Sequence, residues 1–262
     1  MSENILEINN LSKYFGGLAA VSDCSIKVKR GTITGIIGPN GSGKTTLFNL
    51  IAGNLKSSGG NVVFDDENIT DVPSYELFSK GLLRTFQIAH EFSNLSVLEN
   101  LMMVPGNQSG EKIMTALFKP GLVAQEEAVV KEKAKEVVEF LNLGHLSNEL
   151  AGNLSGGQKK LLELGRTMMV DAKLVLLDEV GAGVNRTLLK DLGTAIEKLN
   201  KEKGYTFCMI EHDMDFIGRL CDPVIVMAEG SVLFEGSVED AKKDEKVIES
   251  YLGRGSKLKD TN

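Results

Sequence analysis

Three glycines, a lysine and a threonine lie within one eight-residue stretch, Gly38-Pro39-Asn40-Gly41-Ser42-Gly43-Lys44-Thr45. Because glycine has no Cβ atom, backbone N–H groups in such a stretch can turn inward around phosphate oxygens. A helix that begins near Lys44 adds the positive end of its dipole, Lys44 can reach the β- and γ-phosphates, and Thr45 can ligate Mg²⁺. The spacing predicts a phosphate-binding loop, and a chance glycine turn before a helix is the alternative.

Two carboxylates, Asp178 and Glu179, directly follow the apolar run Leu174–Leu177. Such a run predicts a buried strand, and open α/β sheets bind ligands at the carboxyl ends of their strands. Asp178 is suited to hold Mg²⁺, and Glu179 is suited to orient and deprotonate an attacking water. Alone, two acids after a strand are an ordinary exposed terminus. Beside a phosphate loop they predict the second half of the same site.

A second glycine pair lies in Leu154-Ser155-Gly156-Gly157-Gln158. Ser155 is a good N-cap for a helix expected over Gln158–Val170. Two glycines after a cap weaken a helix, and the sequence shows no structural gain from them. Bare N–H groups at a helix N-terminus suit a phosphate, so we predict a second phosphate-contacting surface here.

The remaining pattern predicts an α/β core that is interrupted by a helical segment. A helix is expected at Thr45–Ala52, and helical periodicity replaces the strand pattern between Gln87 and Leu154. Pro and Gly within Val104–Asn107 and Lys119–Gly121 predict loops. One amphipathic stripe is formed by Val130, Ala134, Val137, Val138 and Leu141. Strands are expected at Ile5–Ile8, Ser25–Lys29, Thr32–Ile37, Asn61–Phe64, Leu174–Leu177, Thr206–Ile210, Val224–Met227 and Val232–Phe234, the last two as a hairpin.

Composition narrows the class of protein. The chain has 262 residues, of which 42% are hydrophobic and 25% charged, and this excludes a disordered chain. The net charge of −7 disfavours a protein that binds nucleic acid independently of sequence. Three distant cysteines, Cys24, Cys208 and Cys221, offer no disulfide framework and no metal spacing. No secretory signal and no apolar run near the roughly 20 residues of a membrane span are present, so a cytoplasmic protein is expected.

The three motifs stand in the order found in the ATP-binding cassette family, whose defining pentapeptide is Leu-Ser-Gly-Gly-Gln, and the chain resembles that family from about Ile5 to Leu252. The resemblance implies an α/β fold: a P-loop NTPase core with a mainly parallel sheet and an N-terminal antiparallel β part, plus a helical subdomain inserted after the glutamine loop. It implies one nucleotide-binding domain over 1–252, with the core at about 1–87 and 159–252, the helical subdomain at about 88–158, and a polar tail at 253–262.

The resemblance also implies ATP and Mg²⁺ as cofactors, and roles for individual residues. In the family, two cassettes pack head to tail, so that the pentapeptide of one contacts the γ-phosphate held by the other. The implied catalytic residues are Glu179, His212 and Gln87, and the implied metal ligands are Thr45, Gln87 and Asp178. The implied nucleotide-binding residues are Phe15, Gly38, Pro39, Asn40, Gly41, Ser42, Gly43, Lys44, Thr45, Thr46, Ser155, Gly156, Gly157 and Gln158. For stacking on adenine, Tyr14 competes with Phe15, and an ordinary core aromatic is the other alternative.

Two positions depart from the family pattern. Val180 stands where many relatives have proline after the catalytic glutamate, and Asn185 stands where aspartate is commonest. Asn185 can still hydrogen-bond a backbone amide, but without the charge. The sequence therefore leaves undecided whether Asn185 makes the family's usual contacts across a dimer. Hydrolysis is not affected, because Lys44, Asp178 and Glu179 are all present.

A looser similarity points to the ATP-binding subunits of branched-chain amino-acid importers. It rests on Phe15–Val21, Gly81–Gln87, the long segment Val104–Lys133 and Ala182–Asn185. Urea or amide importers and lipopolysaccharide-export cassettes share parts of it. The importer resemblance implies two transmembrane permease subunits, a second ATP-binding subunit (identical or different), indirectly an extracytoplasmic substrate-binding protein, no nucleic acid, and a place at the cytoplasmic face of the cell membrane.

Two other classes of protein remain as alternatives. A soluble cassette ATPase of DNA maintenance or translation is disfavoured, because Gln87–Leu154 has no sustained heptads and the chain holds a single cassette. A generic P-loop kinase or GTPase has no use for the Leu154–Gln158 motif.

Overall fold

The structure, a computed structural model, describes residues 2–85, 91–106, 108–111 and 113–256. These fall into two compact units. The first comprises Met1–Arg84, Lys173–Gly181 and Glu197–Asn262, and the second comprises Thr85–Ala172 and Ala182–Ile196. The domain boundaries expected from the sequence remain a prediction.

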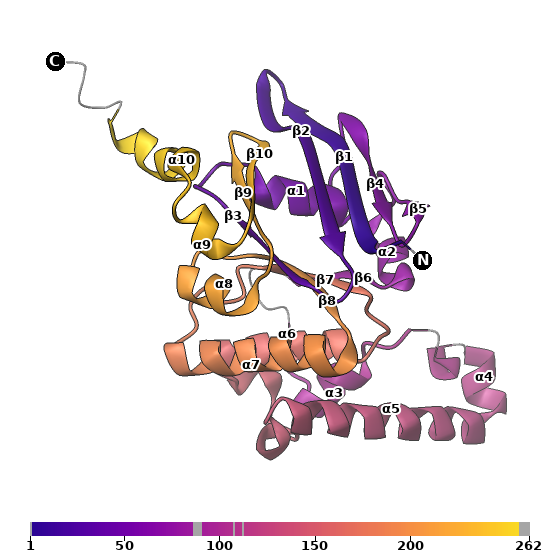
Figure 1. Cartoon of the computed structure of the whole chain (residues 1–262). Helices are drawn as coiled ribbons and strands as arrows, with labels where there is room; N and C mark the ends of the chain where they lie inside the picture. Colours follow the sequence, from indigo (N-terminus) through magenta and orange to yellow (C-terminus); the bar gives the residue numbers. More distant parts are fainter. Residues whose placement is uncertain (1, 86–90, 107, 112, 257–262) are drawn as a thin grey trace. The chain divides into compact units, whose positions relative to one another are not determined.

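The first unit opens with a four-stranded antiparallel sheet in the order β2-β1-β4-β5. Its strands are β1 (Asn4–Phe15), β2 (Leu18–Lys29), β4 (Gly59–Phe64) and β5 (Glu67–Asn68). Figure 1 shows β1 and β2 as one long hairpin at the indigo end of the chain. Both strands are longer than the expected Ile5–Ile8 and Ser25–Lys29. In β2, every second residue from Cys24 to Val28 is buried, and Val21 is buried as well.

The second sheet of this unit has six strands in the order β10-β9-β3-β8-β7-β6. They are β3 (Ile33–Ile37), β6 (Leu82–Arg84), β7 (Leu174–Asp178), β8 (Thr206–Ile210), β9 (Val224–Ala228) and β10 (Ser231–Gly236). Every pairing is parallel except the β9–β10 hairpin. All residues of β3, β7 and β8 are buried. The continuous apolar runs of β7 and β8 and the β-branched residues of β3 predict this burial. The sequence did not predict β6, since three residues are too short to show a period.

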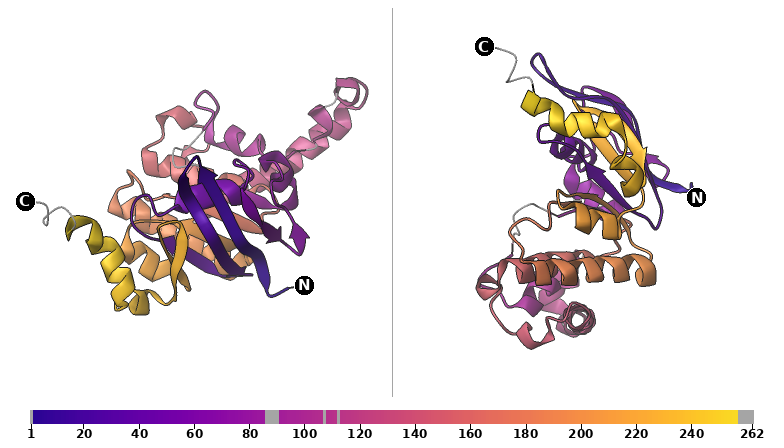
Figure 2. Two further views of the ribbon diagram at one scale, coloured as in Figure 1. Left: turned by 90° about the horizontal axis from the view of Figure 1, so that it is seen from above. Right: turned by 60° about the vertical axis from the view of Figure 1, so that its left-hand side comes forward.

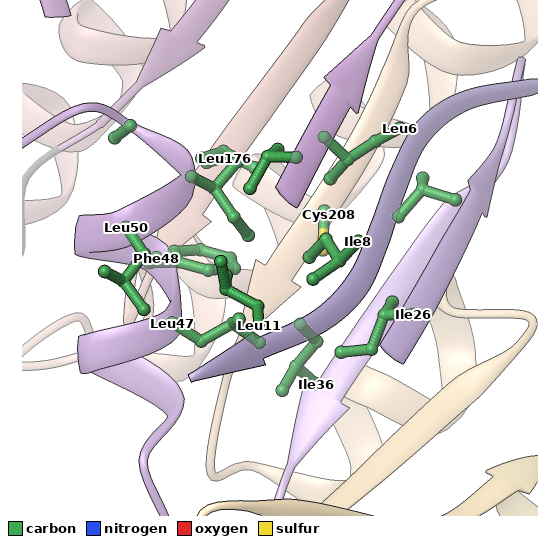
Figure 3. Close-up of a cluster of buried hydrophobic side chains, with 14 of the residues drawn as sticks. Leu6, Ile8, Leu11, Ile26, Ile36, Leu47, Phe48, Leu50, Leu176 and Cys208 are labelled. Carbon is green, nitrogen blue, oxygen red and sulfur yellow. The ribbon is translucent and has the colours of Figure 1, made fainter. Parts of the chain in front are cut away.

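Helix α1 (Lys44–Ile51) packs in the core of the first unit together with strands of both sheets. Figure 3 shows Leu47 and Phe48 of α1 near Leu11 of β1, Ile36 of β3 and Leu176 of β7. Phe48 and Leu47 are completely buried. Because α1 packs against strands of both sheets, the glycine-rich loop that leads into it is anchored at its C-terminal end.

Among the described residues, the first unit also contains α2 (Ser74–Lys80), α8 (Met214–Leu220), α9 (Val238–Ala241), α10 (Glu245–Ser256) and the last part, residues 197–203, of α7 (Arg186–Lys203). In Figure 2, α8, α9 and α10 follow one another in orange to yellow, and α9 and α10 contact β10. Part of the expected polar tail, residues 253–256, belongs to α10. Residues 257–262 lie outside the described residues.

The second unit is helical, as the sequence predicts between residues 87 and 154. It contains η1 (Ser109–Glu111), η2 (Gly144–Leu146) and η3 (Ala151–Asn153), with α3 (Val97–Met102), α4 (Ile113–Phe118), α5 (Pro120–Phe140), α6 (Gly156–Met168) and the first part of α7 (Arg186–Lys203). Helices α3, α5 and α6 contact one another (Figure 1). Four members of the expected stripe, Ala134, Val137, Val138 and Leu141, are buried, whereas the fifth, Val130, is only partly buried.

One loop prediction in this unit is wrong. Lys119–Gly121 is not a loop, because α5 begins at Pro120. Proline is favoured at the first position of a helix, where its missing N–H would have no partner in any case. Within the described part of the chain, no helix is both long and apolar enough to cross a membrane.

Candidate nucleotide-binding site

The loop between β3 and α1 contains the predicted phosphate-binding stretch. Gly38, Gly41 and Gly43 have φ values of 147°, 77° and 100°, a region that other residues rarely adopt. A Cβ atom on Gly38 would lie 2.1 Å from the carbonyl oxygen of Met227, and one on Gly43 would lie 2.4 Å from that of Ala20. The backbone path and the close packing of β9 and β2 therefore both require glycine at these positions.

Lys44 is folded back over this loop. Its Nζ donates hydrogen bonds to the carbonyl oxygens of Gly38 (2.8 Å) and Pro39 (3.0 Å), and the residue is buried. Burial lowers the pKa of Lys44 below its ordinary value, and the nearby carboxylates of Glu179 and Asp178 partly oppose that shift. An ammonium group held this way is well placed for phosphate oxygens.

The side chains of Ser42 and Thr45 indicate which ligand the loop can bind. Among the described residues, Ser42 Oγ is buried and has no hydrogen-bond partner, although a buried hydroxyl normally has one. Thr45, the first residue after Lys44, is exposed. A triphosphate would supply acceptors for both Ser42 and Lys44, so the residues present fit ATP.

Asp178 ends β7, as predicted, and is almost completely buried. Its Oδ2 accepts a hydrogen bond of 2.7 Å from Nη2 of Arg84, the last residue of β6. Arg84 also donates through Nη1 to Oδ1 of Asn49 on α1 (2.7 Å) and lies over the ring of Phe48. Sequence reasoning missed Arg84 and Asn49, because only the neighbouring β6 and β7 and the adjacent α1 bring them to Asp178.

The side chains beside the phosphate-binding loop suit a Mg²⁺ ion that is held by one or two protein oxygens together with a bound phosphate. The described residues contain no cluster of three or more His, Cys, Asp or Glu side chains that could hold a metal alone. Mg²⁺ is commonly bound through one or two side chains together with substrate phosphates. Thr45 and Asp178 are residues of the required oxygen-donor type, and Gln87, the third predicted ligand, lies outside the described residues.

Glu179 and His212 meet directly. Oε1 of Glu179 lies 3.0 Å from Nε2 of His212. A carboxylate only accepts, so Nε2 carries the proton of this hydrogen bond. Glu179 has a left-handed backbone (φ 49°), and its N–H donates to the carbonyl oxygen of Ile210 (2.9 Å). The pairing of Asp178 with Ile210 in the β7–β8 register places the two strand ends side by side.

The Leu154–Gln158 motif begins α6 in the second unit. Ser155 is the N-cap, as predicted, and forms a capping box with Gln158: Ser155 Oγ accepts from the Gln158 N–H (3.4 Å), and Gln158 Oε1 accepts from the Ser155 N–H (2.9 Å). The helix starts at Gly156 rather than Gln158, so both glycines lie in its first turn.

The expectation that neither glycine brings a structural gain is wrong for Gly157. A Cβ atom there would lie 2.5 Å from Cδ1 and 2.8 Å from Cβ of Leu188 on α7, so the close approach requires glycine. At Gly156 a Cβ atom would meet only the carbonyl oxygen of Gly183, at 3.9 Å. Nothing within the described chain explains glycine at position 156.

The remaining residues singled out from the sequence lie on the β1–β2 hairpin, in the loop before α1, within α1 and just before α7. Phe15 and Tyr14 are both about half exposed, so the core-aromatic alternative is wrong for both, and the choice between them for adenine stays open. Asn185 Oδ1 accepts from the N–H of Leu188 (3.0 Å), which confirms that asparagine can bond a backbone amide here. Pro39 and Asn40 lie in the loop before α1, Thr46 lies within α1, and all three are partly or fully exposed.

The fold and this loop place the protein in the P-loop class of nucleotide-binding α/β proteins. The ABC transporter family matches residues 21–182. The chain is 45% identical to the probable branched-chain amino acid transport ATP-binding protein LivG of Archaeoglobus fulgidus, over 95% of each chain. It is 36% identical to the high-affinity branched-chain amino acid transport ATP-binding protein BraF of Pseudomonas aeruginosa, over 97% of this chain and 99% of that protein.

Two solved structures agree with this similarity. A nucleotide-free ATP-binding cassette from an ABC transporter superposes with a TM-score of 0.81 at 41% identity, over 94% of this chain and 98% of that one. An ADP conformation of an ABC transporter cassette gives 0.81 at 40% identity, over 96% and 100%. The chain belongs to the ABC transporter family. It is an ATP-binding cassette and an ATPase, as the sequence motifs predict.

Proposed function

We propose that this cassette is the ATP-hydrolysing subunit of an importer of branched-chain amino acids. The observation that carries the proposal is a phosphate-binding loop and a Glu179–His212 pair in a chain whose full length resembles proteins named for that transport. No residue of the cassette is assigned to the transported amino acid, because membrane subunits and an external binding protein would recognise it.

For the chemical step, we assign Glu179 as the base that orients and deprotonates the attacking water. His212 holds Oε1 of Glu179 through its Nε2 proton and can contact the γ-phosphate. Lys44 and the loop glycines bind the β- and γ-phosphates, while Thr45, Asp178 and Gln87 would hold Mg²⁺. When bound, that ion neutralises charge on the phosphate oxygens.

For the coupling to transport, we propose a head-to-tail pair of cassettes that shares each ATP. The N-terminus of α6, with Ser155 as cap and Gly156 sterically open, would contact the γ-phosphate held by the second cassette. This role parallels that of an arginine finger supplied in trans, which is worth roughly 10³–10⁵ in rate, so an isolated monomer should hydrolyse ATP poorly. The second cassette is either an identical or a different chain.

The working complex then contains two transmembrane permease subunits and, indirectly, an extracytoplasmic binding protein. The cassette would lie at the cytoplasmic face of the membrane, and its binding to the permeases would couple closure of the cassette pair to transport. Shifting the cassette pair from 1:99 to 99:1 in favour of the closed state needs ATP to bind that state by roughly 5.5 kcal/mol more tightly than the open state. Contacts from both cassettes to one γ-phosphate would supply this difference in binding free energy.

The test combines assembly and transport. Light scattering should show dimers of Glu179→Gln with ATP and monomers without it, and the wild-type chain should co-purify with membrane permeases encoded near it. Uptake of labelled leucine, isoleucine or valine into vesicles should require the cassette. Co-purification with ribosomes or DNA instead would favour the soluble ATPase alternative, and uptake of urea or amides alone would reassign the substrate.

A further inference from the structure

Glu211 is a buried carboxylate beside the site that no motif singled out. It is the first residue after β8 and directly precedes His212, and it is only 5% exposed. Burial raises the pKa of Glu211 above its ordinary value, and hydrogen bonds from two backbone amides oppose that shift. A buried acid is costly unless its oxygens accept hydrogen bonds, so the identity of its partners indicates what it does.

Both carboxylate oxygens of Glu211 bind backbone next to the Glu179–His212 pair. Oε1 accepts from the N–H of Gly181 at 2.7 Å, and Oε2 accepts from the N–H of His212 at 3.3 Å. Gly181 lies two residues after Glu179. One side chain therefore joins the turn that carries Glu179 to the strand end that carries His212.

The turn at Glu179 needs such an anchor. A non-glycine residue in the left-handed region is strained and keeps that conformation only when its surroundings fix it. On one side, the Glu179 N–H is bound to the carbonyl oxygen of Ile210. On the other side, the Gly181 N–H is bound to Glu211. The strained residue is thus held at both flanks by the end of β8.

We propose that Glu211 is a positioning residue for ATP hydrolysis: it clamps the backbone on both sides of the Glu179–His212 pair and so fixes Glu179 Oε1 against His212 Nε2. The proposal rests on the role of Glu179 proposed above. Glu211 touches neither the phosphate loop nor Lys44 through any hydrogen bond found in the described residues. Its loss therefore acts on the rate of the chemical step and leaves ATP binding intact.

The experiment compares Glu211→Ala, Glu211→Gln and a control, Glu235→Ala, which removes an exposed glutamate of β10 in the same unit. Misplacing a catalytic group by about 1 Å can cost about 100-fold in rate, so kcat should fall by about that factor in Glu211→Ala at unchanged ATP affinity. Glu211→Gln keeps a carbonyl acceptor for the Gly181 N–H and should recover most of kcat. Glu235→Ala should match wild type.

A second readout reports the clamp directly. Hydrogen exchange of the Gly181 amide, followed by NMR in the full chain, should speed up by about tenfold or more in Glu211→Ala, because a hydrogen bond to a charged group is lost. It should stay slow in Glu211→Gln. Unchanged kcat in Glu211→Ala overturns the proposal, as does a fall in kcat with unchanged Gly181 exchange.

Two outcomes separate this proposal from the one it rests on. If Glu211→Ala does not fold, Glu211→Gln decides: a fall in kcat of about 100-fold while the Gly181 amide stays as protected as in wild type overturns the proposal. If Glu179→Gln still hydrolyses ATP, the role of Glu179 fails, whereas the Gly181 exchange rates still show whether Glu211 holds the turn.

Discussion

Glu179 and His212 are 33 residues apart in sequence, yet Oε1 of one lies 3.0 Å from Nε2 of the other. The pair exists because β7 and β8 are neighbouring parallel strands with Asp178 in register with Ile210. Parallel strands in register end at the same edge of a sheet, so the residues that follow them meet. An acid and an imidazole at this edge can hold and orient a water next to a bound γ-phosphate.

Glu179→Gln should lower kcat for ATP hydrolysis by about 10²–10⁴ and leave ATP binding unchanged, because glutamine keeps the size of the side chain but cannot take a proton. Phosphate release and nucleotide affinity would be measured together. Glu229→Gln is the matched control, since Glu229 is exposed and has the same left-handed φ of 49°. Turnover of Glu179→Gln at the wild-type rate would remove it as the base.

Arg84→Met should destabilise the protein by about 3–5 kcal/mol, because it leaves the carboxylate of Asp178 buried without its cation. Urea unfolding monitored by circular dichroism measures this. Adding Asp178→Asn should restore part of the lost stability, since the uncompensated charge then disappears. If Arg84→Met alone is as stable as wild type, Arg84 does not hold Asp178.

Gly38→Ala should lose ATP binding and stability, because the added methyl group would lie 2.1 Å from the carbonyl oxygen of Met227 at a φ of 147°. The strain alone is worth about 1–3 kcal/mol. Gly59→Ala is the control: its Cβ would meet nothing within 4 Å, and its stability should be unchanged or slightly raised. Thermal unfolding with and without ATP would compare them, and equal shifts in Tm on adding ATP would contradict the prediction.

Gly156→Ala and Gly157→Ala should have opposite effects. Gly157→Ala should destabilise by about 1–3 kcal/mol through overpacking against Leu188. Gly156→Ala should keep or gain stability, since alanine favours a helix by about 1 kcal/mol over glycine, but should lower hydrolysis and ATP-dependent dimerisation. Unfolding free energies and ATPase rates would be measured for both. Full activity in Gly156→Ala would argue against a phosphate contact there.

Asp65→Asn should reduce stability at pH 7 and flatten its acid dependence. Hydrogen bonds from Lys173 and Arg30 hold the pKa of Asp65 below its ordinary value. That stabilisation, about 1–2 kcal/mol for partly exposed partners, is fully present above an unfolded-state pKa of about 4 and is lost as pH falls through the lower folded-state pKa.

Unfolding free energies between pH 2 and 7 would test this prediction, with the adjacent left-handed Asp66, changed to asparagine, as control. Asp66 is exposed, so Asp66→Asn should follow the wild-type pH curve. If Asp65→Asn also follows that curve, the ion pairs of Asp65 contribute no stability.

The sequence alone determined the class of fold, most strands and the chemical identity of the site. Local patterns were enough for these: continuous apolar runs for β7 and β8, β-branched residues for β3, a glycine-rich stretch before α1, and a capping serine before α6. Each of these signals lies within about ten consecutive residues, so no tertiary information was needed to find it.

Tertiary structure alone decided what lies beside those residues. The hydrogen bonds from Arg84 to Asp178 and from Gly181 to Glu211 join segments 94 and 30 residues apart, and β6 is too short to have been predicted. Likewise, the need for glycine at position 157 comes from Leu188 on another helix. Side-chain identity and spacing reveal which chemistry a chain can carry, but the partners that hold each group in place depend on strand order and helix packing, which short-range patterns do not encode.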